Sequence, residues 1–200
     1  REREREEQRN IFERIAGSID GLAEGIQNIK AEDVGKGLLA PLGLIGGIGA
    51  AFIMGGFDGF LIQHKILFYF TPLIAAMAGN VGVQSSAIIV QGLANDDIKG
   101  GILPRVLKEM LLALFNGIIL AVLLFACTWI WKGSLASAFA ISISLIAVII
   151  IAGIIGTFTP MFLHKNKIDP ALATGPFITT CNDIFGILIY FWIAKLILGI

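Results

Sequence analysis

An acidic residue, Asp183, lies inside the last apolar run of the chain and is the first candidate for chemistry. The run carries no charge from Ile184 to Ala194, so the carboxylate stands well inside a membrane-length segment. A carboxylate at bilayer depth costs roughly 2.5–3.5 kcal/mol on insertion scales, and such a residue is by default a functional candidate. We therefore expect Asp183 either to bind an ion or to hydrogen-bond another helix.

The neighbours of Asp183 at helical spacing offer further oxygen atoms. Gly175, Thr179, Asp183, Gly186 and Tyr190 recur at steps of three and four residues, so a helix would place them on one face. Carboxylate, hydroxyl and carbonyl oxygens suit hard cations such as Mg²⁺ or Ca²⁺. The Thr179 hydroxyl could equally well bond to the preceding helical turn.

Two prolines shape the start of this segment. Asp169 precedes Pro170, which is the order expected of a capping carboxylate and a first-turn proline. Pro176 is predicted to lie inside the helix, where it would remove one backbone hydrogen bond and free the carbonyl of Leu172. The turn before Thr179 is then predicted to be loosened.

A second polar stripe occurs earlier in the chain. Asn80 and Gln84 are one helical turn apart, and Gln91 follows seven residues later. Pro72 and nearby glycines are predicted to interrupt this helix, as a polar path through a membrane would need. The alternative is that the amides form hydrogen bonds between helices and hold the bundle together.

The remaining polar residues indicate no catalytic chemistry. Glu109 is expected to form an interfacial charge cluster with Arg105 and Lys108. His64 and His164 have no paired ligands at metal-type spacing, and no glycine-rich phosphate loop occurs. The formal net charge is zero and no basic cluster is interleaved with aromatic residues, so we expect neither an enzyme nor a nucleic-acid-binding protein.

The elements that must position these residues are membrane helices. Hydrophobic residues make up 56% of the 200 residues, and the mean hydropathy is +0.83. This composition predicts an all-α polytopic membrane protein of five spans. The spans are expected at about 37–57, 66–94, 103–131, 135–163 and 170–200. Residues 1–37 are predicted to form a charged amphipathic helix on the cytoplasmic or membrane face, and 38–200 the transmembrane domain.

Basic residues predict the orientation in the membrane. The N-terminal segment, the connection after the second span together with its flank, and the connection after the fourth span hold seven, three and two Lys and Arg residues. The opposite side holds only Lys65, Lys132 and Lys195. The positive-inside rule therefore predicts a cell-membrane protein whose N-terminus is cytoplasmic and whose C-terminus is outside.

Two motifs together resemble the transmembrane domain of the MgtE family of magnesium channels. They are Pro72-x6-Gly79-Asn80-x-Gly82-x-Gln84-Ser85 and Asp169-Pro-Ala-x4-Pro176-x2-Thr-Thr180-x2-Asp183-x2-Gly186, and Lys108-Glu109-Met110 also matches. The resemblance covers about residues 38–200.

The resemblance implies a homodimer in the lipid bilayer, with an ion path along its two-fold axis lined by the second and fifth spans. It implies that Asp183 of each subunit forms the principal Mg²⁺ site, with the backbone carbonyl of Thr179 beside it. The other expected pore-lining residues are Asn80, Gln84, Gly175, Pro176, Asn182, Gly186 and Asp169.

Two departures from the family pattern bear on function. Val83 stands where the family commonly has a second asparagine, so selectivity among divalent cations is expected to be looser. Typical members carry a cytoplasmic Mg²⁺-sensing domain and paired CBS domains before the membrane part, whereas about 37 residues precede the first predicted span here. Closure by such a sensor is therefore not assumed.

Three functions follow as hypotheses. The first is a channel for Mg²⁺ influx. The second is a secondary carrier coupled to Na⁺ or H⁺, which two broken helices would also suit. The third is a membrane scaffold that transports nothing, which would tolerate substitution of both Asp183 and Asn80.

Overall fold

The structure is a computed structural model that describes residues 31–98, 101–132, 134–173 and 175–199. The chain divides into two units, Arg1–Ala40 and Pro41–Ile200, and the account below concerns the second. The helix predicted over residues 1–37 falls, up to residue 30, outside the described residues.

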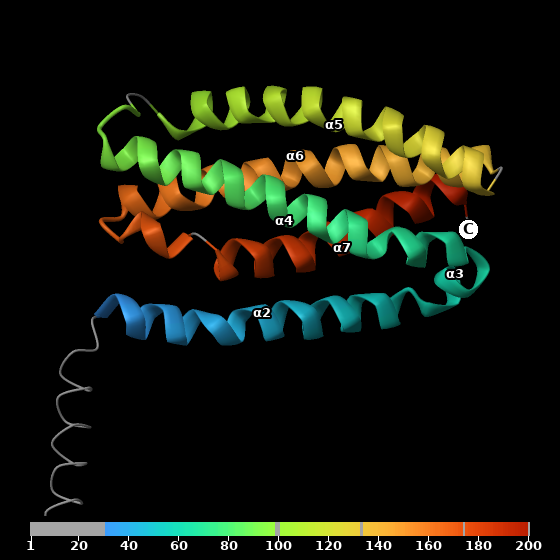
Figure 1. Ribbon diagram of the computed structural model, residues 1–200, viewed down its shortest axis with the longest axis horizontal. Coiled ribbons are helices and arrows are strands. Elements are labelled where there is room, and N and C mark those ends of the chain that lie inside the picture. The colour runs from blue at the N-terminus through green and yellow to red at the C-terminus, as the bar shows by residue number, and fades with distance from the viewer. Residues whose placement is uncertain (1–30, 99–100, 133, 174, 200) are drawn as a thin grey trace, which may run out of the picture. The chain divides into compact units, whose positions relative to one another are not determined.

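The described residues form helices and no strand (Figure 1). In chain order the elements are α2 (Ala31–Gly56), α3 (Asp58–Gln63), α4 (Lys65–Ala94), α5 (Ile102–Lys132), α6 (Leu135–Lys165), the 3-10 helix η1 (Pro170–Ala173) and α7 (Pro176–Leu198). The prediction of an all-helical membrane protein is confirmed.

Four of these helices, α4, α5, α6 and α7, are long and apolar enough to cross a membrane. They have few charges, and a helix satisfies its own backbone hydrogen bonds where no water is present. In the second unit, α2 contributes only the shorter apolar stretch Pro41–Gly56. The count of five spans therefore stays a prediction.

Helix α6 is the centre of the bundle and contacts α4, α5 and α7. Its side chains Ile141, Leu145, Val148 and Ile149 are almost completely buried. The N-terminus of α6 is capped by Ser134, whose hydroxyl accepts a hydrogen bond from the Ser137 amide at 3.3 Å.

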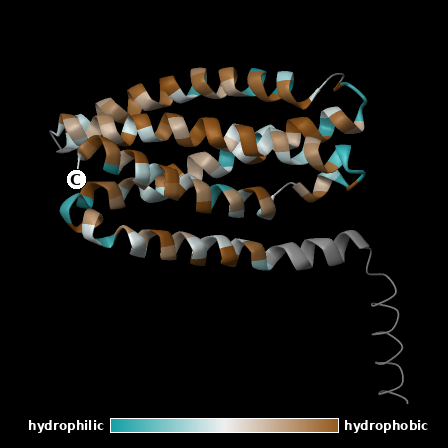
Figure 2. Cartoon of the chain, turned by 180° about the vertical axis from the view of Figure 1, so that it is seen from behind, coloured by the Kyte–Doolittle hydropathy of each residue, from teal (hydrophilic) through white to brown (hydrophobic). Residues whose placement is uncertain are grey.

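Helix α5 carries a wide apolar face that no other described element covers. The exposed residues recur every three or four positions along it: Leu103, Leu107, Leu111, Phe115, Ile118 and Val122. Figure 2 shows the same helix as largely hydrophobic along its length. Soluble monomers rarely expose an apolar surface of this extent, so this face is suited to lipid.

One expectation about the backbone is wrong. Helix α4 runs unbroken through Pro72, because the loss of one hydrogen bond is tolerated within a long, otherwise continuous helix. The connection between the predicted spans 37–57 and 66–94 contains the short helix α3, which buries Phe60 and Leu61 against the bundle.

Candidate cation pocket

A pocket of about 400 Å³ lies between α4 and α7, and it contains the principal residues predicted from the sequence. Its lining residues are Ala75, Ala76, Gly79, Asn80, Val83 and Gln84 from α4, with Thr179 and Asp183 from α7. The two polar stripes that were far apart in the sequence therefore face a common space.

Asp183 is half-buried, and no other described residue forms a hydrogen bond or ion pair with its carboxylate. Helix α2 approaches it at Gly46, where an added Cβ would lie 3.4 Å from Asp183 Oδ2 and 3.0 Å from Thr180 Cα. The alternative that another helix neutralises this acid through a hydrogen bond is not realised in this part of the chain. The carboxylate is available to a ligand in the pocket.

Asn80 and Gln84 are exposed side chains on the α4 wall of the pocket. Neither amide is used to join α4 to another described helix. Val83 lies between them in the lining, so the position where the family commonly has asparagine does face the same space. Amide and carboxylate oxygens are the ligands that hard cations prefer.

The start of α7 differs from the prediction at Pro176. The helix begins at this proline, whose missing amide hydrogen costs nothing in the first turn, so Pro176 is not inside a helix. Gly175 precedes it with φ of 55°, a conformation that favours glycine. The segment before it is the separate 3-10 helix η1. The backbone before Thr179 is therefore irregular, as predicted, but a proline inside a helix is not the cause.

Hydroxyl groups at the start of α7 donate to carbonyl oxygens of its first turn. Thr179 Oγ1 donates to the carbonyl oxygens of Gly175 and Pro176 at 3.3 and 3.0 Å. Thr180 Oγ1 donates to Pro176 O at 2.7 Å and to Leu42 O of α2 at 2.6 Å. The Thr179 hydroxyl therefore bonds to the preceding helical turn, which was one of the two possibilities predicted from the sequence.

Five residues predicted to line the path are not in the lining of this pocket: Gly175 and Pro176 at the start of α7, and Asn182, Gly186 and Asp169. Asn182 is 1% exposed and donates from Nδ2 to Ala78 O at 3.1 Å. Gly186 is buried, and an added Cβ there would lie 3.3 Å from Ala78 Cβ. Asp169 is exposed at the start of η1, where its Oδ1 accepts from the Ala171 amide at 2.9 Å, as expected of a cap.

Other polar residues near the pocket were not predicted to matter individually. Ser85 Oγ donates to Glu109 Oε1 of α5 at 2.5 Å, and Ser86 Oγ donates to Ala173 O of η1 at 2.5 Å. Glu109 is thus bonded to α4, in place of the expected charge cluster with Arg105 and Lys108. The only signal in the sequence was the pair of serines directly after Gln84.

Close packing fixes the two walls of the pocket against each other. A Cβ added at Gly82 of α4 would collide with Asn182 Nδ2 of α7, and one added at Gly156 of α6 would collide with Gly82 O. Gly156 lets the backbones of α6 and α4 approach closely, and Gly82 makes room on α4 for the Asn182 side chain of α7.

The charge in the pocket comes from one acid. No group of three or more His, Cys, Asp or Glu side chains gathers anywhere among the described residues. One carboxylate and two amides could hold a hydrated hard cation weakly, whereas a strong dehydrated site needs more oxygen ligands.

Comparison with known proteins places these observations in a family. The family model MgtE, described as a divalent cation transporter, matches residues 71–193. The magnesium transporter MgtE of Bacillus subtilis is 39% identical over 158 residues, which cover 78% of this chain and 34% of that protein. The MgtE proteins of Enterococcus faecalis and Thermus thermophilus are 34% and 31% identical, over 75% and 78% of this chain. The chain spans about a third of the length of these relatives.

Proposed function

Because this chain belongs to the MgtE family of divalent cation transporters, we propose that it carries Mg²⁺ across the membrane through the pocket between α4 and α7. The observation that supports this most directly is Asp183: its carboxylate lines the pocket beside Asn80 and Gln84 and has no bonding partner in the described chain. An intramembrane acid without a protein partner needs a ligand to offset its desolvation.

The size of the pocket supports a hydrated ion. A water molecule occupies about 30 Å³ of liquid, so the six waters of Mg²⁺ need roughly 180 Å³. The pocket, at about 400 Å³, is larger than this. Mg²⁺ releases water reluctantly, so in our proposal the oxygens of Asp183, Asn80 and Gln84 accept hydrogen bonds from its waters. Weak binding of this kind allows rapid release, as conduction requires.

The charge of Mg²⁺ favours a second acid. We propose a homodimer in which Asp183 of each subunit faces the same ion on the two-fold axis, with the Thr179 carbonyl beside it as the family resemblance implies. Without a cation, two facing carboxylates repel and one tends to hold a proton. A divalent cation removes this penalty, which couples occupancy to the stability of the dimer.

The direction of transport in this proposal is influx. The distribution of Lys and Arg predicts that α4 begins and α7 ends outside, and the inside-negative membrane potential then drives Mg²⁺ toward the cytoplasm. Coupling to Na⁺ or H⁺ is less favoured than passive conduction, because α4 is continuous and only the η1–α7 segment is interrupted.

The test is Mg²⁺ uptake into proteoliposomes, followed with an internal Mg²⁺-sensitive dye. We expect Asp183→Asn to lower the initial rate at least ~10-fold, because an amide of the same shape lacks the charge that holds the ion. Asp97→Asn, the same substitution at an exposed position after α4, is the matched control and should retain uptake. Uptake by Asp183→Asn at the rate of the unsubstituted protein would refute the proposal.

A further inference from the structure

The pocket face of α4 continues beyond the cation pocket toward the beginning of the helix. Its members recur at steps of three and four residues: Lys65, Phe68, Tyr69, Pro72, Ala75, Ala76, Gly79, Asn80, Val83 and Gln84. The last six line the pocket at Asp183, and the first three line a second pocket. Pro72, between the two sets, is exposed. One helix face therefore leads from the second pocket to the first.

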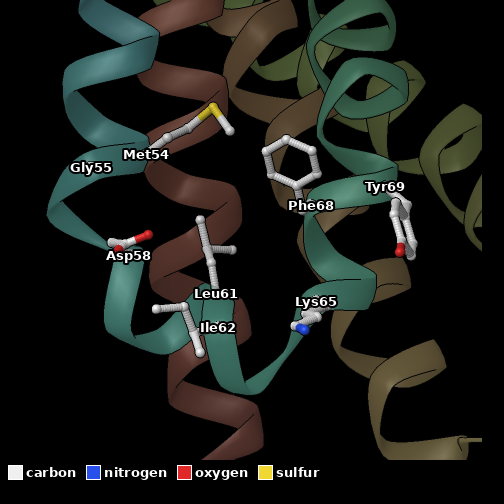
Figure 3. A pocket seen from close by; sticks show the side chains of 8 residues that line it. All are labelled: Met54, Gly55, Asp58, Leu61, Ile62, Lys65, Phe68 and Tyr69. Atoms are coloured by element: carbon white, nitrogen blue, oxygen red, sulfur yellow. The ribbon is translucent and has the colours of Figure 1, made fainter.

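The second pocket has a volume of about 350 Å³ and lies where α2, α3 and α4 meet (Figure 3). Its walls are mainly apolar, with Met54, Leu61, Ile62 and Phe68 among them. Asp58 of α3 and Lys65 of α4 are its two charged residues, and Figure 3 shows them on opposite sides of Leu61 and Ile62. Like the first pocket, it is larger than the roughly 180 Å³ of six waters.

The acid in this pocket is isolated from the other acids of the described chain. Asp96, Asp97, Glu109 and Asp169 belong to the opposite end of the bundle, where α4 ends and α5 and η1 begin (Figure 1). Asp58 is exposed, and no ion pair in the described structure joins it to Lys65. Within Pro41–Ile200, Asp58 is thus the sole described carboxylate at the end where α4 begins.

We infer that this second pocket is the outer mouth of the proposed Mg²⁺ path, with Asp58 attracting hydrated divalent cations and Lys65 opposing them. The inference rests on the proposed function, and it adds two residues that set the rate of entry. Asn80 lies 15 residues beyond Lys65, so the mouth is ~22 Å along the helix from the site at Asp183.

The charges of Asp58 and Lys65 have opposite expected effects on the local concentration of Mg²⁺. A fixed charge near an entrance changes the local concentration of mobile ions, and the interaction energy with a divalent ion is twice that with a monovalent one. Removing the charge of Asp58 lowers the local Mg²⁺ concentration, and removing that of Lys65 raises it. Neither change affects an entrance that is already saturated with Mg²⁺.

The experiment measures initial Mg²⁺ uptake into proteoliposomes at subsaturating and saturating Mg²⁺, in about 0.01 M and about 1 M monovalent salt. Over this range the Debye length falls from ~30 to ~3 Å. In low salt and subsaturating Mg²⁺, we expect Asp58→Asn to slow uptake on the order of threefold and Lys65→Gln to accelerate it by a similar factor. Both effects should disappear in high salt and at saturating Mg²⁺. Asp97→Asn serves as the control for a charge at the opposite end.

Two results would overturn the inference. One is uptake by both variants at the unsubstituted rate in low salt. The other is a loss that persists equally at saturating Mg²⁺ and in high salt, which would mark a structural effect. If Asp58→Asn does not fold, Lys65→Gln still tests whether removing a positive charge from this pocket accelerates Mg²⁺ uptake. Failure of the proposed function is distinct, because the unsubstituted protein would then not take up Mg²⁺ or would do so equally with Asn at position 183.

Discussion

The carboxylate of Asp183 lies in an environment that disfavours its charge, and it also lines a pocket that a cation could occupy. It lies in a helix long and apolar enough to span a membrane, where an ionised acid is costly, and it faces a pocket whose other polar groups are uncharged. The neutral amides of Asn80 and Gln84 orient water but add no charge. In our proposal, one residue per chain therefore sets most of the strength with which the pocket holds a cation, and the neighbouring oxygens set its selectivity.

Val83 offers a test of how the neighbouring oxygens affect the affinity for Mg²⁺, at the scale of one side chain. Val83→Asn places a further amide oxygen in the lining between Asn80 and Gln84. One added hydrogen bond to a hydrated ion is worth ~1 kcal/mol, or about fivefold, so the Mg²⁺ concentration for half-maximal uptake should fall by about that factor. Val90→Asn, on the same helix outside the pocket, should leave it unchanged. An unchanged value in Val83→Asn would show that this position does not contact the ion's waters.

At the scale of the elements, the packing of α4 on α6 should be sensitive to a single methyl group. In Gly156→Ala the new Cβ would collide with Gly82 O and lie 3.0 Å from Ser85 Cβ. Overpacking of this kind costs ~1–3 kcal/mol, so the thermal unfolding midpoint in detergent should fall. Gly47→Ala is the control, because nothing lies within 4 Å of its Cβ and alanine favours a helix by about 1 kcal/mol. Equal midpoints for Gly156→Ala and the unsubstituted protein would contradict the close contact.

The element boundaries show which structural features can be predicted from one sequence. The bounds of α4, α5 and α6 agree with the prediction to within about two residues, because uncharged apolar runs end at charged or turn-forming residues. The effect of a proline was not predictable in the same way. Pro72 leaves its helix continuous and Pro176 begins one, because each outcome depends on whether neighbouring helices support the preceding turn.

The pocket was predictable to the extent that its polar residues follow a helical period. Asn80, Gln84, Thr179 and Asp183 do line one space. Asn182 and Glu109 could not be placed in this way. Their hydrogen-bond partners, Ala78 O and Ser85, lie on α4, and spacing along their own helices does not reveal them. The approach of Gly46 to Asp183 likewise depends on tertiary packing.

At the scale of the whole molecule, our proposal requires two copies of a chain of 21.4 kDa. Light scattering in detergent should give a protein mass about twice that value. Mg²⁺ should raise the thermal unfolding midpoint, because a ligand that binds only the folded state stabilises it. Asp183→Asn should lose this shift, whereas Asp97→Asn should keep it. A monomeric protein that takes up Mg²⁺ at full rate would contradict the shared site.

The contact at Gly82 has a mechanical consequence for the proposed path. At this one residue α4 has no clearance toward either α6 or α7, and it lies between Asn80 and Gln84 in the sequence. A side chain at position 82 would therefore force α4 away from α7, and one at position 156 would force α6 away from α4. In our proposal the distance between the two pocket walls of one subunit thus depends on these two glycines, so a larger residue at either position is expected to change the width of the path as well as the stability of the bundle.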